Sequence, residues 1–162
     1  MPTHRESRRL AYSPEQLFDL VADVGSYPKF LPWVAATRIR ERSDAQLIAD
    51  MSVGFGPFRE TFRSKVTLDR PRHLHVDYLS GPLKYLNNDW RFRAVDGGTI
   101  IDFAVAFEFK QKILEAAAGA FFNEAFRRMV AAFERRACQV YGQGNCPPSV
   151  AVPVPEAASA GR

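Results

Sequence analysis

Two histidines and an aspartate alternate along one short segment, at His73, His75 and Asp77. Alternate residues of a β-strand point to the same face of a sheet, so these three side chains would lie side by side. Two imidazoles and a carboxylate form a ligand set that can hold a metal ion. The sequence shows no further residues that would orient these ligands, so we predict that no metal is held there.

Polar residues also interrupt the apolar register of two other strand-like segments. Glu60 and Ser64 do so in FRETFRSKVTL, and Asn88 does so in LNNDWRFRA. Buried polar groups need partners, so such residues either anchor the polar head of a bound ligand or lie at a wet opening. Glu60 is the one acid that this pattern places on an inner face.

Basic residues recur on the opposite register of several segments. They are Arg38, Arg40, Arg42, Arg59, Arg63, Lys65, Arg91 and Arg93. Rows of such groups can bind the phosphates of lipids or of ribosomal RNA, although a solvated sheet face explains the same pattern. The net charge of +4 is compatible with a phosphate-bearing partner and does not require one.

Motifs of the common enzyme classes are absent from the sequence. It has no P-loop, no dinucleotide-binding glycines and no cysteine nucleophile beside a base, and no Ser-His-Asp arrangement can be read. We therefore expect a protein that is not an enzyme and uses no cofactor. The N-terminal residues contain no apolar signal segment, and no run approaches the roughly 20 apolar residues that span a bilayer. We expect a cytoplasmic protein, and a monomer.

The elements that would position these residues follow from the apolar periodicity. Ser13 is a good N-cap and Pro14 suits the first helical position, so a helix is predicted from there to about Val24. Helical apolar spacing without proline predicts one long helix over residues 111–141. Residues 3–12 are predicted as a first strand. Period-two alternation predicts further strands at 36–42, 45–55, 58–68, 74–80, 86–94 and 99–109.

The apolar faces of these elements predict an α+β fold, in which a curved antiparallel sheet of six or seven strands wraps on the long C-terminal helix. One helix about 10 Å wide cannot cover so wide a sheet. The uncovered part is then filled by aromatic side chains or left as a cavity. Residues 1–142 would form this domain, and the Pro/Ala-rich residues 143–162 are predicted to be disordered.

The segment YPKFLPW, residues 27–33, carries three aromatic residues and two prolines, which exclude a regular helix or a central strand. It is too apolar for an ordinary surface loop. We predict a mobile lid at the cavity mouth, with Phe30 and Trp33 facing inward and Lys29 outward, because a charged head seeks water. The alternative is a packed loop that completes the core.

Four segments carry a family resemblance. DVGSYPKFLPWV, GFGPFRETFRSKVTL, SGPLKYLNNDWRF and MVAAFERRACQVYG, in this order and spacing, are similar to the coenzyme Q-binding START-domain family, within the START-like helix-grip superfamily. Its bacterial members are also described as ribosome-association toxins and are grouped with polyketide cyclases and dehydrases. The resemblance spans about residues 3–142 and implies the helix-grip fold, with two short helices after the first strand.

The resemblance implies a lipid-binding carrier for ubiquinone or a similar prenylated lipid, one that supports respiratory electron transport. A cavity lined by aromatic residues suits an apolar ring with an isoprenoid tail. The predicted lining comes from the inner strand register, the helix stripe and the lid. It consists of Phe30, Trp33, Phe55, Phe62, Tyr78, Leu86, Trp90, Phe92, Phe103, Phe107, Phe122 and Met129.

Two alternative functions stay open. A ribosome-association toxin would bind the large ribosomal subunit and block subunit joining; it needs the basic outer face and tolerates a filled core. A polyketide cyclase or aromatase would need a titratable pair inside the cavity. A carrier would also contact the inner face of the membrane through the Arg-rich outer sheet face.

Overall fold

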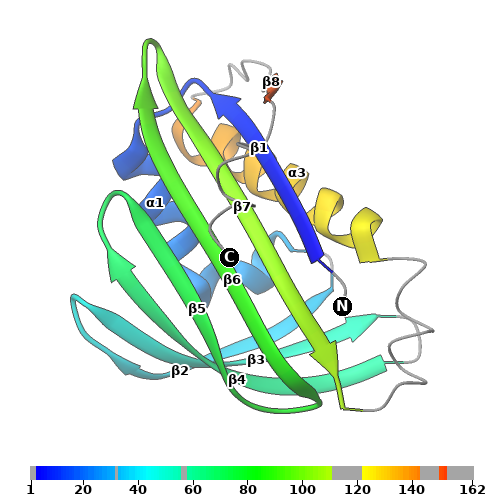
Figure 1. Ribbon diagram of the computed structural model, residues 1–162. Helices are drawn as coiled ribbons and strands as arrows, with labels where there is room; N and C mark the ends of the chain where they lie inside the picture. Colours follow the sequence, from blue (N-terminus) through cyan, green and yellow to red (C-terminus); the bar gives the residue numbers. More distant parts are fainter. Residues whose placement is uncertain (1–2, 32, 56–57, 111–121, 143–149, 153–162) are drawn as a thin grey trace, which may run out of the picture.

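The computed structural model describes residues 3–31, 33–55, 58–110, 122–142 and 150–152. Figure 1 shows a long, curved antiparallel sheet with helices on its inner side. The elements in chain order are β1 (Thr3–Leu10), α1 (Pro14–Ala22), the 3₁₀ helix η1 (Val24–Lys29), β2 (Val34–Arg42), β3 (Gln46–Phe55), β4 (Phe58–Asp69), β5 (His73–Ser80), β6 (Leu83–Val95), β7 (Gly98–Phe109), α3 (Phe122–Tyr141) and β8 (Val150–Val152).

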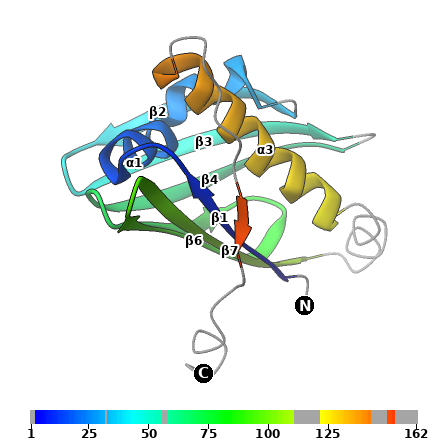
Figure 2. The ribbon, with the colours of Figure 1, turned by 90° about the horizontal axis from the view of Figure 1, so that it is seen from above.

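The sheet is a meander of β2 to β7, and the first strand extends it by pairing with β7. Its order is β2-β3-β4-β5-β6-β7-β1-β8, so consecutive strands from β2 to β7 are neighbours and β1 pairs with β7. Viewed from above, α3 runs along the inner side of the curved sheet, and α1 packs beside it (Figure 2). The predicted helix-grip fold and its two short helices after β1 are confirmed.

A capping box fixes the start of α1. The Ser13 side chain accepts a hydrogen bond from the Gln16 backbone N–H (3.1 Å), and the Gln16 side chain accepts one from the Ser13 N–H (3.0 Å). This arrangement satisfies two donors that a helix terminus would otherwise leave without partners. The helix then buries one apolar stripe, made of Leu17, Phe18, Leu20 and Val21.

The core lies between the inner face of the sheet and α3. Alternation along the strands buries Leu47 and Ala49 on β3, and Leu74 on β5. Phe133 of α3 is the meeting point of several elements. Its ring centroid lies 5.1 Å from that of Trp90, and close to two rings of the 27–33 segment. Helix α3 therefore packs on the sheet through aromatic contacts.

Two expectations differ from the structure or fall outside it. Helix α3 is described from Phe122, and residues 111–121 of the predicted helix lie outside the described part. Residues 150–152 of the predicted tail form β8 against β1, whereas 143–149 and 153–162 lie outside the described residues. Cys138 is disulfide-bonded. Among the described residues, no helix is long and apolar enough to cross a membrane.

Gly98 permits the close approach of β7 to the end of β1. A Cβ at this position would lie 2.0 Å from the backbone carbonyl oxygen of Leu10. We predict that Gly98→Ala lowers the free energy of unfolding by about 1–3 kcal/mol, because backbone must shift to admit the methyl group. Urea denaturation checks this.

The matched control for this substitution is Gly25→Ala, since no atom lies within 4 Å of a Cβ built on Gly25. The control should be neutral or slightly stabilising, because alanine restricts the unfolded chain. Equal unfolding midpoints for the two variants would contradict the account of the β1–β7 contact.

Candidate functional site

A small cavity lies between the sheet and α3 among the described residues. Its volume is about 20 Å³, which is room for about one water molecule and far below the size of a ligand pocket. Its apolar lining consists of Leu10, Leu17, Leu20, Val21, Trp90, Ile101, Phe103, Val130 and Phe133. Its polar lining consists of Glu6, Arg8 and Glu134.

A chain of charged groups forms one wall of this cavity. Along the inner face of β1, His4 Nε2 lies 3.1 Å from a Glu6 carboxylate oxygen, and Arg8 lies 3.3 Å from the other. Arg8 Nε lies 2.5 Å from a Glu134 oxygen on α3. These four side chains are largely buried, and the His4 ring stacks on Phe126. The polar chain joins β1 to α3 inside an apolar shell.

The polar chain was missed by sequence reasoning. The alternating signal is present, because His4, Glu6, Arg8 and Leu10 share one register of β1 and Leu10 is buried. Three charged or polar residues in that register are typical of a solvated face, so nothing in the first strand indicated an inner face. The pairing of Arg8 with Glu134, 126 residues away, helps to compensate this burial and cannot be read from the first strand alone.

The predicted lining residues divide into groups. Trp90, Phe92, Phe103 and Phe107 are buried, and two of these, Trp90 and Phe103, reach the cavity with ring centroids 4.6 Å apart. Phe62 is half-buried, and its ring centroid lies 6.5 Å from that of Tyr78. The side chains of Phe55 and Phe122 lie outside the described residues. The partly buried members packed against the core are Phe30, Trp33, Tyr78, Leu86 and Met129.

The 27–33 segment packs against α3 with its aromatic side inward. Tyr27 is buried, and its hydroxyl donates a hydrogen bond to the Val21 carbonyl; burial raises the pKa of this hydroxyl. The Phe30 ring lies 5.2 Å from that of Phe133, and the Arg136 guanidinium lies 5.3 Å from the Phe30 ring centroid. Lys29 is exposed. The mobility of the segment stays a prediction.

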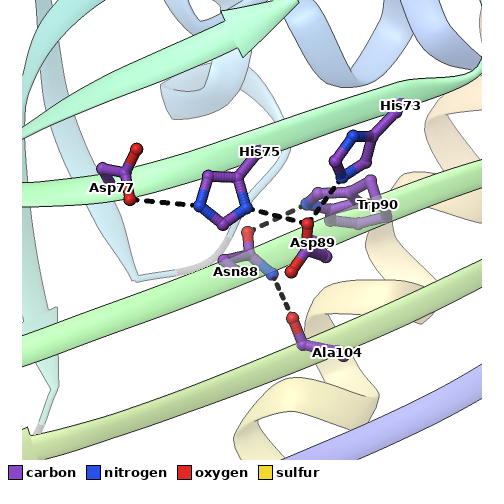
Figure 3. A network of polar contacts seen from close by, with 7 residues as sticks. All are labelled: His73, His75, Asp77, Asn88, Asp89, Trp90 and Ala104. Atoms are coloured by element: carbon purple, nitrogen blue, oxygen red, sulfur yellow. Dashed lines mark hydrogen bonds and ion pairs between the residues drawn. The ribbon is translucent and has the colours of Figure 1, made fainter. Parts of the chain in front are cut away.

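The three polar residues that interrupt the apolar strand register differ in their burial and in their contacts. Glu60 is exposed, so it is not an inner anchor in this structure. Ser64 is buried, and its hydroxyl has no hydrogen-bond partner among the described residues. Asn88 accepts a hydrogen bond from Trp90 Nε1 and donates one to the Ala104 carbonyl, each 3.0 Å long (Figure 3). Asn88 therefore orients Trp90 in the cavity wall.

The outer face is less basic than its composition indicates. Asp50 accepts hydrogen bonds from both Arg40 and Arg63, each at 2.7 Å. Arg93 lies 3.2 Å from Asp102. A β-bulge between Ile39 and Glu41 shifts the register, so that Arg42 pairs with inward-facing Leu47. Among the predicted outer-face arginines that keep the outer register, Arg38, Arg59 and Arg91 are exposed and make no ion pair within the described ranges.

His73 and His75 share the outer face of β5, as predicted from their alternation. The structure adds Asp89 of the neighbouring strand β6, which lies directly opposite His75. Partial burial lowers the pKa of His75, but hydrogen bonds and charges from Asp89 and Asp77 raise it by more. The net pKa is therefore above its ordinary value, which shows that the carboxylates favour positive charge here.

The paired Asp50 predicts an acid-dependent stability. Hydrogen bonds from Arg63 and then Arg40 lower the pKa of Asp50 from 3.8 to about 2, despite the opposing effect of burial. A lowered pKa stabilises the fold at pH values above 3.8, and this contribution is lost as the pH falls through about 2. We predict that Asp50→Asn is less stable than wild type above pH 3.8 and that the difference shrinks towards pH 2.

Urea denaturation of both proteins across this pH range checks the prediction. Asp44→Asn is the control, because Asp44 is exposed and makes no ion pair within the described ranges. A difference between wild type and Asp50→Asn that stays constant with pH would contradict the assignment.

Comparisons with known proteins agree on one family. Residues 10–134 match the family described as polyketide cyclase / dehydrase and lipid transport. The ribosome association toxin RatA of Rickettsia prowazekii is 35% identical over 86% of this chain and 99% of its own. The mitochondrial coenzyme Q-binding protein COQ10 homolog B of Xenopus laevis is 33% identical over 88% of this chain, which spans 61% of that protein.

Solved structures have the same fold. The solution structure of an 18 kDa protein from Caulobacter crescentus is 38% identical, with a TM-score of 0.72 over 88% of this chain and 99% of that one. A START superfamily protein from Mycobacterium smegmatis has a TM-score of 0.70 at 17% identity, over 85% of this chain and 98% of that one. With its START-like fold and the match over residues 10–134, the chain belongs to the polyketide cyclase / dehydrase and lipid transport family.

Proposed function

We propose that the protein binds ubiquinone or a similar prenylated lipid between the sheet and α3, and carries it in support of respiratory electron transport. The observation that carries this proposal is the polar chain through Glu6, Arg8 and Glu134 in the wall of an otherwise apolar cavity. A closed core gains little from a buried ion chain, because desolvation offsets most of its attraction. A ligand with a polar ring and an apolar tail needs both kinds of lining.

The proposed ligand needs more room than the cavity of about 20 Å³ provides. The 27–33 segment is the element that we expect to move. It contacts α3 through the rings of Tyr27 and Phe30 near Phe133, and these ring contacts would break. Its outward displacement would join the cavity to the surface. Burial of an isoprenoid tail gains about 25 cal/mol per Å² removed from water, which offsets the loss of these ring contacts.

The relatives support the lipid class. The Xenopus laevis relative is named a coenzyme Q-binding protein, and the family description includes lipid transport. A cyclase or aromatase activity has less support. Glu6 and Glu134, the carboxylates that line the cavity, are both held by Arg8, and Glu60 is exposed.

Arg8 should anchor the polar ring of the ligand. In a Trp33→Phe background, Trp90 is the only tryptophan and lies in the cavity wall, so a short-chain ubiquinone should quench its fluorescence in a saturable way. We predict that Arg8→Gln in this background weakens quinone binding by roughly tenfold or more, the usual scale for a lost hydrogen bond to a charged group.

The matched control is Arg5→Gln, since Arg5 lies on the same strand and is exposed on its other face. It should leave the affinity unchanged. Circular dichroism of each variant verifies that it is folded, because Arg8→Gln removes the partner of Glu134. Saturable binding that is equally strong in the Arg8 and Arg5 variants would contradict the anchor, and the absence of saturable quenching would contradict the proposal itself.

A second candidate is binding to the large ribosomal subunit, which would block subunit joining. Three exposed arginines of the outer sheet face, which make no ion pair with the described residues, favour it: Arg38, Arg59 and Arg91. Guanidinium groups that are free of carboxylates can bind RNA phosphates. The Rickettsia prowazekii relative, named a ribosome association toxin, supports this reading.

Charge reversal separates this candidate from a general charge effect. We predict that Arg59→Glu with Arg91→Glu lowers co-sedimentation with large ribosomal subunits, and that the loss is greater at low salt. The control is Arg127→Glu with Arg135→Glu, which makes the same charge change on exposed positions of α3. An equal loss in both double variants would mean that only the net charge matters.

A further inference from the structure

The outer face of the sheet carries a compact group of possible metal ligands. His73 and His75 come from β5, and Asp89 comes from β6, where the strand register sets it opposite His75. One ligand atom from each residue lies within 4.8 Å of the other two. Figure 3 shows both imidazole rings directed at the same carboxylate. Two neighbouring strands therefore bring three donors together with no loop involved.

Only a small movement of the side chains would convert these hydrogen bonds into a metal coordination sphere. A single Asp89 oxygen lies 2.6 Å from His73 Nε2 and 2.8 Å from His75 Nδ1. Two ligand atoms on a tetrahedral Zn²⁺ lie about 3.4 Å apart, because each is about 2.0–2.2 Å from the ion. Each contact with Asp89 would need to open by less than about 1 Å. Side-chain rotation alone provides such a movement.

A second carboxylate orients one of the donors. Asp77 lies 3.1 Å from His75 Nε2, the ring nitrogen that does not face Asp89. A histidine that binds a metal usually donates its other N–H to a carboxylate or carbonyl, which fixes the tautomer and raises the basicity of the ligand nitrogen. This contact is the orienting interaction that the sequence did not reveal, and it is independent of the three-ligand cluster.

The strand that carries Asp89 is held firmly in place. Its neighbours Asn88 and Trp90 point to the inner face, where Asn88 bonds both Trp90 and the Ala104 carbonyl of β7 (Figure 3). Ligands on paired strands are positioned more accurately than ligands on loops. The donors are also accessible, because the side chains of His73, His75 and Asp89 are between a quarter and a third exposed.

Carboxylates outnumber basic side chains around the group. The strand register places Asp69 and Arg91 on either side of His73, and Lys65 beside Asp77. Arg91 is exposed and free to extend into solvent. The carboxylates of Asp77 and Asp89 remain in direct contact with the rings. The local field at the ligand atoms is therefore set by these two acids.

We propose that His73 Nε2, His75 Nδ1 and an Asp89 carboxylate oxygen bind a divalent transition-metal ion of the Zn²⁺ type, with Asp77 as the orienting partner of His75. A solvent molecule completes the tetrahedral set, because the site faces water. Two imidazole nitrogens and one carboxylate suit Zn²⁺ better than the oxygen-preferring Mg²⁺ or Ca²⁺. The ion would cross-link β5 to β6, and this site is independent of the proposed lipid function.

Isothermal titration calorimetry tests the proposal on the metal-free full chain near neutral pH, with Zn²⁺ alone as the titrant. We expect saturable binding of one equivalent. His75→Gln and Asp89→Asn should each weaken binding by at least tenfold. Asp77→Asn should weaken it by about 10–100-fold through loss of orientation. Asp96→Asn is the matched control, since Asp96 is exposed in the turn after β6, and it should bind as wild type does.

Two further measurements keep the test decisive. Co²⁺ in place of Zn²⁺ should give the visible absorption bands of a tetrahedral ion in wild type and not in the double variant His73→Gln with His75→Gln. Thermal unfolding should show that Zn²⁺ stabilises wild type and not that variant. The absence of saturable Zn²⁺ binding to wild type would overturn the proposal. Equal binding by wild type and the folded double variant would overturn it as well.

Discussion

Helix α3 packs along the concave face of a long curved sheet (Figure 2), and this packing is the interaction on which the rest of the structure depends. Phe133 is its centre, because the rings of Trp90, Tyr27 and Phe30 all lie within 5.4 Å of its centroid. Sheet, helix and the 27–33 segment therefore meet in one aromatic cluster. Under the proposed lipid function, loosening these contacts enlarges the interior, so the cluster would also set where a ligand enters.

The polar chain that begins on β1 places charged groups inside this otherwise apolar interior. Glu6, Arg8 and Glu134 cost free energy to bury, and replacement by apolar residues is often neutral or stabilising in other proteins. Retaining them beside an apolar cavity suits a ligand that has a polar end. The outer face has its own chemistry, with arginines partly neutralised by Asp50 and Asp102, and with the histidine and aspartate group of β5 and β6. The proposals thus place a lipid and charged partners on opposite faces of one sheet.

The sequence predicted the structural features that depend on residues close together in the chain. The Ser13 N-cap and the period-two strands are examples, because capping and alternation are properties of short segments. Contacts between strands were not predictable. The sequence placed Asp77 with the two histidines, but the register adds Asp89 from β6. The bulge that turns Arg42 to the inner register and the burial of Arg8 by Glu134 likewise depend on distant pairing. The fold was therefore more predictable than the site.

The central claim is that the space between the sheet and α3 opens to admit one prenylated lipid. Native mass spectrometry of the full chain after incubation with ubiquinone, and of the protein as purified, tests this most directly. The account predicts a species heavier than the bare chain by the mass of one quinone, which Arg8→Gln depletes and Arg5→Gln retains. A spectrum that contains only the bare chain, even with ubiquinone in excess, would contradict it.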